Sequence, residues 1–341
     1  MQKIIIAGFG FMGGMHAQVY RQLPAARLAA VVDKNKATAT RAMAKLGIKA
    51  PLFADLDAAL RSIPCHVVDI CLPTDLHTTF ALSAIKAGKH IFCEKPLALL
   101  PADAQKIATT AHAVGVAGQV GQCIRFWPEY VALRDFVRRG QAGPLRSLTL
   151  QRRSMLPLHS VGRWLLDPKR SGGAALDLHI HDTDFIVSLL GRPRAVRSHA
   201  TFDGHGPSHI LTTYDYPGVA VAAEGGWNYP PKWGFQMAFQ AVFENGAVEY
   251  DSGASPTLTV TLGRTAKKPL PFKEPAIGRS ASGTGNISSL GGYFNELQYF
   301  IDCLEKGRLP AEATLLQATE SLRVAVAELA SARAGGRIIK L

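Results

Sequence analysis

The segment Ile4–Gly13, IIIAGFGFMG, decides which fold this chain is expected to adopt. Ile4–Ala7 is an apolar run typical of a buried strand, and it leads into the spacing G-x-G-x-x-G and a helical stretch. Gly8 permits a tight turn, Gly10 lets the backbone approach a pyrophosphate, and Gly13 lets the helix pack closely against the strand. The first N–H groups of such a helix attract phosphate. The segment therefore predicts a dinucleotide-binding turn.

The residue that ends the second expected strand indicates which dinucleotide is bound. Leu28–Val32 is apolar and is followed by Asp33, which lies twenty positions after Gly13. A carboxylate at this place accepts hydrogen bonds from the ribose hydroxyls and repels a 2′-phosphate. We therefore predict NAD rather than NADP, although the neighbouring Lys34 and Lys36 act against that preference.

Strands and helices continue to alternate through the first third of the chain. Further strands are expected at Leu52–Phe53, Val67–Leu72, His90–Cys93 and Val116–Val120, and helices at Thr38–Leu46, Leu56–Arg61, His77–Lys86 and Asp103–Val114. This alternation predicts a parallel, doubly wound sheet. Ligands of such sheets bind beyond the carboxyl ends of the strands, where Leu72-Pro73-Thr74 and Glu94-Lys95-Pro96 are expected.

The pattern changes after Gln122. Helices are expected at Pro128–Arg139, Leu176–Leu190 and Leu315–Arg333, and short β-rich runs with turns fill Ala195–Leu262. This predicts an α+β domain with a large, mainly antiparallel open sheet and helices on one face. We expect residues 1–123 to form an NAD(P)-binding Rossmann domain, and residues 124–341 to form a domain for substrate binding and oligomerisation. The Gly- and Ser-rich segment Gly278–Gly292 is expected to be a loop.

The composition excludes several classes of partner. Thirty-eight Lys and Arg residues against 26 Asp and Glu give a net charge of +12, but they are scattered, so we predict no nucleic-acid partner. No apolar run reaches the roughly eighteen residues of a membrane span, and the N-terminus lacks a signal-peptide pattern. The five cysteines form no C-x-x-C pair, which indicates reduced thiols. We expect a cytoplasmic protein that binds a small molecule.

The stretch LDLHIHDTDF, Leu176–Phe185, places titratable groups on a half-buried helix. Asp177 and His181 are four residues apart and therefore share a helix face. A histidine that hydrogen bonds orient in a cleft acts as a general base near neutral pH. Two alternatives stay open: these side chains face solvent, or His179 and His181 bind a metal with an aspartate. The His-x-His spacing shares one face only in a strand, so we predict no metal site.

Three longer stretches resemble a known family. They are DICLPTDLHTTFALSAIKAGKHIFCEKPLA at Asp69–Ala98, RSGGAALDLHIHDTDFI at Arg170–Ile186, and GYFNELQYFIDCLEKGRLP at Gly292–Pro310. With them, essentially the whole chain resembles the Gfo/Idh/MocA oxidoreductases, relatives of glucose–fructose oxidoreductase and inositol dehydrogenase. The resemblance implies the same two-domain fold.

The resemblance also implies roles for three residues at the reaction centre. Lys95 matches the lysine that contacts both substrate and nicotinamide in the family. Asp177 matches the carboxylate that orients the substrate, and His181 matches the histidine that transfers the proton. Pro96 matches a proline whose preceding peptide bond is often cis in relatives.

The glycine motif and the resemblance together predict the cofactor-binding residues. They are Gly8, Gly10, Phe11, Met12, Gly13, Asp33, Leu72, Pro73, Thr74, His77, Glu94, Lys95, Arg125 and Trp164. The match is looser for Arg125 and Trp164. Leu72 departs from the family, in which many members carry Thr or Ser, so a cofactor contact there would use the backbone. His179 stands where many relatives carry glycine, and it is expected to alter the pocket wall.

The activity that the resemblance implies is hydride transfer between a nicotinamide cofactor and a hydroxyl or keto carbon of a sugar, sugar derivative or inositol. Two alternatives follow from the same family. One is an NAD-dependent glycosidase that oxidises its substrate transiently, and the other is a non-catalytic NAD(P)-binding sensor. A sensor would be expected to lose the lysine or histidine, whereas Lys95 and His181 are both present. The open face of the second sheet is expected to bury against another subunit, which predicts a homodimer or homotetramer.

Overall fold

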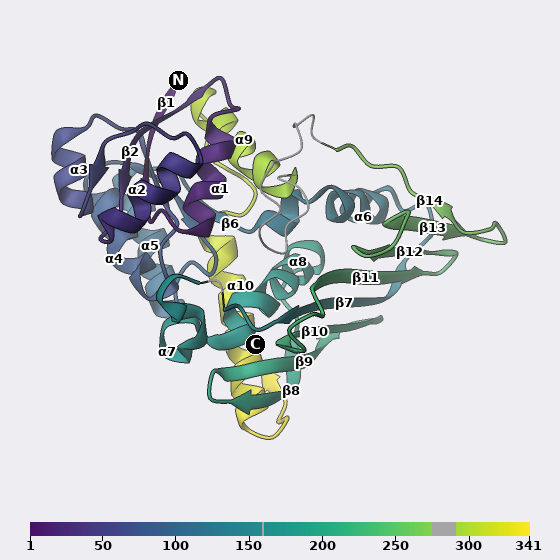
Figure 1. Cartoon of the computed structure of the whole chain (residues 1–341). Coiled ribbons are helices and arrows are strands. Elements are labelled where there is room, and N and C mark those ends of the chain that lie inside the picture. The colour runs from purple at the N-terminus through teal and green to yellow at the C-terminus, as the bar shows by residue number, and fades with distance from the viewer. Residues whose placement is uncertain (159, 275–290) are drawn as a thin grey trace. The chain divides into compact units, whose positions relative to one another are not determined.

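The computed structural model describes residues 1–158, 160–274 and 291–341, and it separates the chain into two units. Within the described residues, unit 1 comprises 1–123, 160–164 and 291–319, and unit 2 comprises 124–158, 165–274 and 320–341 (Figure 1). Residues 278–290 of the expected loop Gly278–Gly292 lie outside the described residues. Its last two residues, Gly291 and Gly292, begin a helix.

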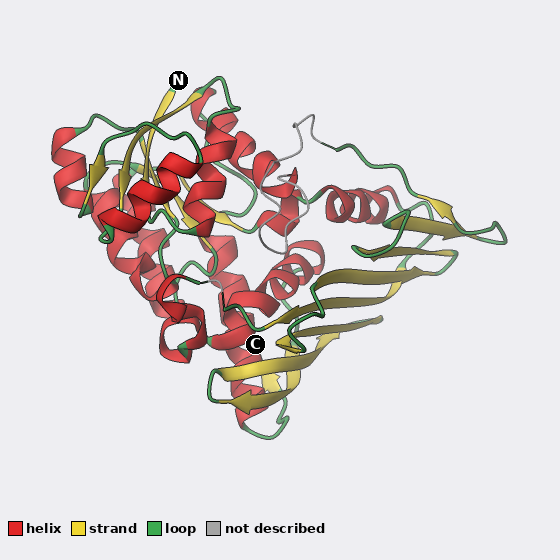
Figure 2. Ribbon diagram, in the orientation of Figure 1, coloured by secondary structure: helices red, strands yellow, loops and turns green. Residues whose placement is uncertain are grey.

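Unit 1 is built on a six-stranded parallel sheet with the strand order β3-β2-β1-β4-β5-β6. Figure 2 shows its strands in yellow with the helices of the unit in red around them. The strands are β1 (Gln2–Ala7), β2 (Ala26–Val32), β3 (Leu52–Phe53), β4 (Val67–Ile70), β5 (His90–Glu94) and β6 (Gly118–Gly121). The helices are α1 (Phe11–Tyr20), α2 (Lys36–Lys45), α3 (Leu56–Ser62), α4 (Thr74–Lys86), α5 (Pro101–Val114) and α9 (Gly291–Glu305).

The central strands of this sheet are buried because helices pack against them. All four residues of β4 and the last four of β1 are buried, as expected for strands covered on both faces. Helix α1 packs against α9, β1 and β2, whereas α4 packs against α5, β4 and β5. The strand order reverses between β1 and β4, which is where doubly wound sheets bind their ligands. The turns that follow these two strands therefore share one edge of the sheet.

Unit 2 is built on a nine-stranded sheet with the order β14-β13-β12-β11-β7-β10-β9-β8-β15. Its neighbouring strands are antiparallel except β7 and β10, which are parallel. The strands are β7 (Leu145–Met155), β8 (Ala195–Asp203), β9 (Gly206–Tyr216), β10 (Val219–Tyr229), β11 (Phe235–Phe243), β12 (Gly246–Asp251), β13 (Leu258–Leu262), β14 (Lys268–Pro269) and β15 (Ile339–Lys340). The helices are α6 (Pro128–Arg139), α7 (Pro168–Ser171), α8 (Ile180–Leu190) and most of α10 (Leu315–Arg333).

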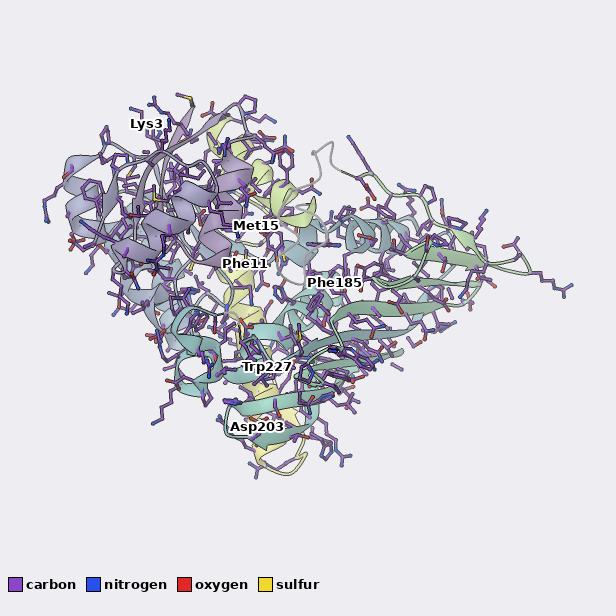
Figure 3. All side chains as sticks on the ribbon, in the orientation of Figure 1. Lys3, Phe11, Met15, Phe185, Asp203 and Trp227 are labelled. Carbon is purple, nitrogen blue, oxygen red and sulfur yellow. The ribbon has the colours of Figure 1, made fainter. Side chains whose placement is uncertain are left out.

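Helices bury one face of the second sheet. In β7 the alternate residues Leu148 and Leu150 are buried while Thr149 is exposed, which is the period of a strand with one covered face. Tyr130 of α6 packs edge to face on Phe185 of α8, with 4.9 Å between ring centroids, and 5.0 Å from Phe239 of β11. Figure 3 shows Phe185 among the side chains at this face. These aromatic contacts fix α8 against the sheet.

The expected helix Leu176–Leu190 consists of two parts. Residues Ala175–His179 form a π-helical turn, and the α-helix begins at Ile180. The turn packs against β9 and β10. A Cβ atom at Gly225 of β10 would lie 2.7 Å from the Cβ of His179, so a glycine is needed there for the turn to approach the sheet. π-Helical turns are rare and are often found at functional sites.

The expected fold class is confirmed in both parts, and only boundaries differ. β4 ends at Ile70, and α4 begins at Thr74 rather than at His77. β6 spans Gly118–Gly121, which is shifted from the expected Val116–Val120. Thr74 and His77 therefore belong to the first turn of α4. In the part of the chain that the structure describes, no helix is long and apolar enough to cross a membrane.

Candidate active site

The glycine turn after β1 has the geometry that pyrophosphate binding requires. Gly8 has φ +93°, and a Cβ there would lie 2.5 Å from the carbonyl oxygen of Cys71. A Cβ at Gly13 would lie 2.0 Å from the Gly8 carbonyl oxygen, so only glycine allows this packing. Around Gly10 the space is open, and no side chain caps the helix that starts at Phe11. The space beside Gly10 at the N-terminal end of α1 is thus open to an anion.

Phe11 and Met12 form the first turn of α1. Phe11 is 40% exposed, and Figure 3 shows it at the start of the helix, with Met15 one turn further on. Met12 is half-buried. An exposed aromatic side chain directly after the open turn can cover a bound dinucleotide, but its role there stays a prediction.

Asp33 bridges the end of β2 and the glycine turn. Its Oδ2 accepts a hydrogen bond from the Phe9 N–H at 2.9 Å, and its Oδ1 accepts one from the Asn35 N–H at 2.8 Å. Both bonds hold the half-buried carboxylate beside the turn. Lys34 and Lys36 are exposed. The carboxylate therefore lies beside the glycine turn, and its contact with a ribose stays a prediction.

The His77 ring connects the two loops at the carboxyl ends of β4 and β5 through its two nitrogens. Its Nδ1 lies 2.8 Å from the Pro96 carbonyl oxygen, and its Nε2 lies 2.8 Å from the Leu72 carbonyl oxygen. Burial lowers the pKa of this imidazole, although both carbonyls oppose the shift. A neutral imidazole donates only one of these two hydrogen bonds. Because His77 is buried and engaged with the backbone, it shapes the loop of Leu72, Pro73 and Thr74.

The Glu94-Lys95-Pro96 segment follows directly from β5. The Lys95–Pro96 peptide bond is cis, as the family resemblance implied, and the Lys95 side chain is half-buried. Glu94 is 6% exposed, and its Oε2 accepts a hydrogen bond from the Lys95 N–H at 3.2 Å. The carboxylate lies over Gly121 of β6, where a Cβ would come within 3.1 Å of it. Lys95 is thus held at the sheet edge by a buried carboxylate.

A buried polar cluster that sequence reasoning missed lies beneath this segment. His16 of α1 has its Nδ1 2.9 Å from Asp69 of β4 and 3.2 Å from the Cys71 sulfur. Its Nε2 lies 3.1 Å from Glu94 Oε1, although the pair is not aligned as a hydrogen bond. Glu296 of α9 is fully buried nearby. An acidic residue inside the apolar run of β4, VVDI, was the signal that could have indicated this cluster.

Two groups in this cluster have the spacing of metal ligands within the described residues. They are His16, Asp69 and Cys71, and His16, Glu94 and Glu296, with one ligand atom of each within 4.8 Å of the others. Both groups depend on His16. The alternative metal set of His179, His181 and an aspartate is not among them in the residues described.

In unit 2, Asp177 lies in the π-helical turn and His181 lies in the first turn of α8. Both side chains are half-buried, whereas His179 between them is fully buried. His179 Nε2 lies 3.0 Å from Glu328 of α10, and Glu328 Oε1 accepts a hydrogen bond from the Thr183 hydroxyl at 3.0 Å. Two half-buried titratable groups therefore flank the buried His179 in this helical segment.

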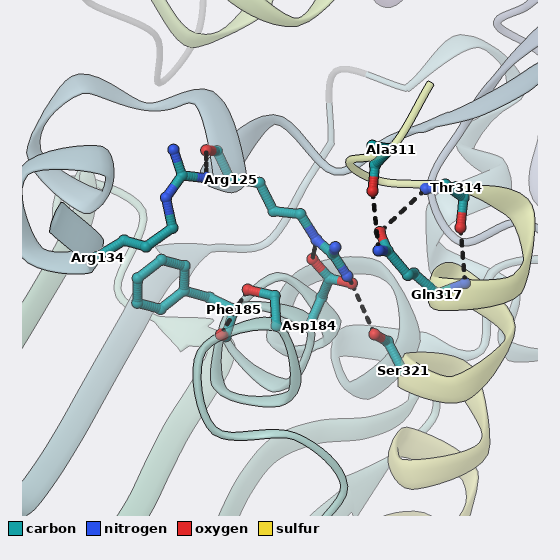
Figure 4. Close-up of polar contacts among 9 residues, drawn as sticks. Arg125, Arg134, Asp184, Phe185, Ala311, Thr314, Gln317 and Ser321 are labelled. Carbon is teal, nitrogen blue, oxygen red and sulfur yellow. Dashed lines mark hydrogen bonds and ion pairs between the residues drawn. The ribbon is translucent and has the colours of Figure 1, made fainter. Parts of the chain in front are cut away.

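Arg125 is engaged in a buried ion pair within unit 2 (Figure 4). Its Nε and Nη2 each donate to a carboxylate oxygen of Asp184 at 2.7 Å, and the Ser321 hydroxyl donates to the same carboxylate at 2.6 Å. Such a bidentate pair fixes the start of the second unit against α8. Direct contact of Arg125 with the nicotinamide stays a prediction. Trp164 lies in the 3-10 turn Val161–Leu166 and is half-buried, and its role also stays a prediction.

Two family models match the chain. The model described as "Oxidoreductase family, NAD-binding Rossmann fold" matches residues 2–122, and the GFO/IDH/MocA C-terminal domain matches residues 130–261. Inositol 2-dehydrogenase from Pseudarthrobacter chlorophenolicus is 30% identical over 319 residues, which cover 90% of this chain and 87% of that protein. The chain belongs to the Gfo/Idh/MocA oxidoreductases. As a member of this family it is an NAD-binding oxidoreductase, which confirms the activity class and the cofactor expected from the sequence.

The names of other similar proteins indicate different substrates. D-glucoside 3-dehydrogenase from Escherichia coli is 28% identical over 201 residues, covering 58% of this chain and 57% of that protein. Among solved structures, levoglucosan dehydrogenase with NADH and levoglucosan superposes with a TM-score of 0.82 at 21% identity, covering 99% of both chains. An oxidoreductase from Agrobacterium radiobacter, in complex with NAD+, L-tartaric acid and magnesium, gives 0.85 at 18% identity over 99% of this chain and 98% of that one. These structural matches confirm the fold.

Proposed function

We propose that this protein is an NAD-dependent dehydrogenase that oxidises a secondary hydroxyl group of a cyclic polyol, with inositols as the first substrates to test and sugars or glycosides second. The observation that carries the proposal is the match to inositol 2-dehydrogenase over 90% of this chain. Lys95, Asp177 and His181 accompany that match at half-buried positions where a small molecule could reach them.

The residues of unit 1 fit the cofactor. The open turn at Gly10 and the uncapped start of α1 would hold the pyrophosphate, and the Asp33 carboxylate would accept hydrogen bonds from the adenosine ribose. A negative charge there disfavours the 2′-phosphate of NADP. When bound, NAD supplies the hydride acceptor.

Residues of the chain would accept the proton of the substrate hydroxyl and stabilise the negative charge on its oxygen. In the proposed reaction the imidazole of His181 accepts the hydroxyl proton as the substrate carbon loses its hydride. The Lys95 ammonium donates a hydrogen bond to the same oxygen and stabilises the negative charge that develops on it. The Asp177 carboxylate orients the substrate. Each role is a proposal carried over from the family onto these positions.

A substrate panel tests the function. Purified protein is assayed for NAD reduction with myo-inositol, other inositol isomers, glucose, methyl glucosides and sugar acids, each with NAD and with NADP. We expect NADH formation with a cyclic polyol. Glycoside cleavage without NADH accumulation would favour the glycosidase alternative, and cofactor binding without turnover of any compound would favour the sensor.

Cofactor choice is tested separately at Asp33. NADH and NADPH are titrated into the wild type and into Asp33→Ala. We expect the wild type to bind NADH more tightly and the variant to narrow the difference by about tenfold, the factor that corresponds to 1.4 kcal/mol. Tighter binding of NADPH to the wild type would contradict the role of Asp33.

We also propose that the protein is a cytoplasmic homodimer or homotetramer. All five cysteines are free thiols, which supports a reducing compartment. On the sheet face of unit 2 that the helices leave open, Leu211 is 50% exposed and Val242 is 39% exposed. Apolar side chains on an open sheet face support burial against a second copy. Light scattering of the purified protein measures the oligomeric state, and a monomer would contradict the proposal.

A further inference from the structure

We propose that His16 is a positioning residue for the reaction: through the Glu94 carboxylate it fixes the backbone at Lys95. This inference rests on the proposed function, because it concerns how the proposed catalytic lysine is held. His16 lies in helix α1, far from Lys95 in sequence, and neither the sequence motifs nor the family resemblance pointed to it.

The geometry forms a continuous path from β4 to the lysine. Asp69 Oδ2 lies 2.9 Å from His16 Nδ1, so the aspartate sets the orientation of the imidazole ring. On the other side of the ring, Nε2 lies 3.1 Å from Glu94 Oε1. The second carboxylate oxygen, Glu94 Oε2, accepts the Lys95 N–H at 3.2 Å. The path ends at Lys95, the residue that is proposed to contact the substrate.

Burial makes this path rigid. His16 and Asp69 are fully buried, and Glu94 is 6% exposed. Phe92 of β5 packs edge to face on the His16 ring, with 5.5 Å between ring centroids. In such a setting a charge contact is screened little by solvent, and a side chain has few alternative rotamers.

The backbone of the adjacent strand lies close to the Glu94 carboxyl group. Glu94 pairs with Gly121 of the adjacent strand β6, and a Cβ at Gly121 would lie 3.1 Å from three atoms of the carboxyl group. The φ angle of Gly121 is not in the left-handed region. Alanine at this position is thus compatible with the backbone but would move the carboxylate by a few tenths of an ångström, which perturbs the path without removing any charge.

The charge on His16 supports this role. Burial alone would lower the pKa of the imidazole, but Asp69 and Cys71 outweigh burial and hold the pKa well above its ordinary value. The raised pKa favours the protonated imidazole, which lies between the carboxyl groups of Asp69 and Glu94. Burial raises the pKa of Cys71, so the thiol remains protonated and is not a nucleophile.

Glu296 completes the charge balance. Burial and the nearby Glu94 raise the pKa of its carboxyl group well above the ordinary value, which makes it a neutral acid near pH 7. It is fully buried, and neither of its carboxyl oxygens has a hydrogen-bond partner. The His16 ring thus lies between the carboxyl groups of Asp69 and Glu94.

The experiment compares His16→Gln, Gly121→Ala and Lys95→Ala with the wild type on the substrate that the panel identifies. Thermal unfolding, NADH binding, kcat and KM are measured for each protein, and metal content is measured for the wild type. The matched control is His112→Gln, which replaces an exposed histidine of α5 in the same unit.

We expect His16→Gln to lower kcat by about 10- to 100-fold, because a shift of about 1 Å in a positioned group has an effect of this size. Gly121→Ala is expected to lower kcat by about 3- to 10-fold for a smaller displacement. NADH affinity and KM should change by less than about threefold, since the path contacts neither ligand. The control is expected to match the wild type.

Each of the other possible results contradicts either the positioning role of His16 or the proposed function. Wild-type kcat in a folded His16→Gln protein, or an equal loss of NADH binding and kcat, overturns the positioning role. A stoichiometric metal ion in the wild type does the same, because His16 would then be its ligand. If His16→Gln does not fold, Gly121→Ala decides, and an unchanged kcat there overturns the inference. Wild-type kcat in Lys95→Ala contradicts the proposed function instead, whatever the His16 variant shows.

Discussion

A buried histidine lies against a carboxylate behind the proposed catalytic residues in each unit, but the two contacts are built from different neighbours. In unit 1, His16 Nε2 lies 3.1 Å from Glu94, directly before Lys95. In unit 2, His179 Nε2 lies 3.0 Å from Glu328, and His179 ends the π-helical turn. Both histidines and Glu328 are fully buried. Both units thus place a buried histidine beside a carboxyl group, and the side chains around that pair differ.

The side chains around each histidine determine whether its contact depends on charge or on hydrogen bonding. Around His16 the neighbours are titratable side chains, because Asp69, Cys71 and Glu94 all lie beside the ring. Around His179 they are mainly hydroxyl groups: the Tyr214 hydroxyl lies 3.4 Å from Nε2 and 3.2 Å from the Thr183 hydroxyl. Hydroxyl groups donate and accept without changing charge in the physiological range. We infer that the unit 1 contact is governed by charge and the unit 2 contact by hydrogen bonding and packing.

The largest expected effects are on turnover, and they test whether both units contribute to one reaction. His181→Ala in unit 2 should lower kcat by about 10²- to 10⁴-fold, because general acid–base catalysis contributes that much. Lys95→Ala in unit 1 should lower kcat by about 10²- to 10³-fold, the usual effect of one preorganised donor. Steady-state kinetics on the identified substrate measures both.

The double variant sharpens this result. Since His181 and Lys95 are proposed to act on the same oxygen, the double variant should lose less than the product of the two single losses. Thermal unfolding serves as the control for folding. A full multiplicative loss would contradict a shared oxygen and would separate the contributions of the two units.

The second effect is on stability and concerns unit 2. Glu328→Ala should lower the free energy of unfolding by about 2–5 kcal/mol, because the Thr183 hydroxyl would lose its buried hydrogen-bond acceptor and His179 would lose the carboxyl group 3.0 Å from its Nε2. Glu328→Gln keeps an acceptor oxygen in the same place and should lose less. Denaturant unfolding measures both variants. Equal losses would show that charge, not hydrogen bonding, governs this contact, and would remove the difference between the units.

A third pair of variants compares the packing of the two contacts. A Cβ at Gly225 would lie 2.7 Å from His179 Cβ and 3.1 Å from its Cα, so Gly225→Ala forces backbone or helix movement. We expect a loss of about 1–3 kcal/mol, typical of overpacking. The matched change in unit 1 is Gly121→Ala, which meets only the end of the Glu94 side chain at 3.1 Å. Its effect on stability should be smaller, and denaturant unfolding that ranks the two in the opposite order would contradict the comparison.

Much of the fold could be predicted because local sequence carries it. The apolar run before Gly8 and the spacing of the next two glycines specify a strand, a turn and a helix within one short segment. Asp33 could be predicted at the end of β2 for the same reason, since strand length sets its place. The π-helical turn could not be predicted, because it depends on the close approach of His179 to Gly225, some 46 positions later in the chain.

The polar clusters were beyond sequence reasoning for a similar reason. His16, Asp69, Glu94 and Glu296 come from four different elements, so no single segment shows that they meet. Only the sheet order, which places β1 beside β4 and β4 beside β5, brings them together. Arg125 shows the same limit, because its partner Asp184 lies on a helix 59 positions away.

The smallest expected effect is a pH dependence, and it depends on every ionisable group that faces His16. These groups are Asp69 and Cys71 at the end of β4, Glu94 of β5, Tyr20 of α1 and Glu296 of α9. Burial raises the pKa of Tyr20, of Cys71 and of Glu296, so these three stay neutral near pH 7. His16 is thus the group whose charge is expected to change between neutral and alkaline pH.

The sign of the dependence follows from the raised pKa of His16. A histidine whose pKa is higher in the folded than in the unfolded protein stabilises the fold fully below the unfolded value of 6.5, and this stabilisation is lost as the pH rises through the folded pKa. The difference in unfolding free energy between wild type and His16→Gln should therefore be largest below pH 6.5 and should shrink in alkaline buffer. Urea unfolding at a series of pH values measures it, with His112→Gln as the exposed control. A difference that stays constant, or grows with pH, would mean that His16 is held neutral, and the unit 1 contact would then resemble that of unit 2.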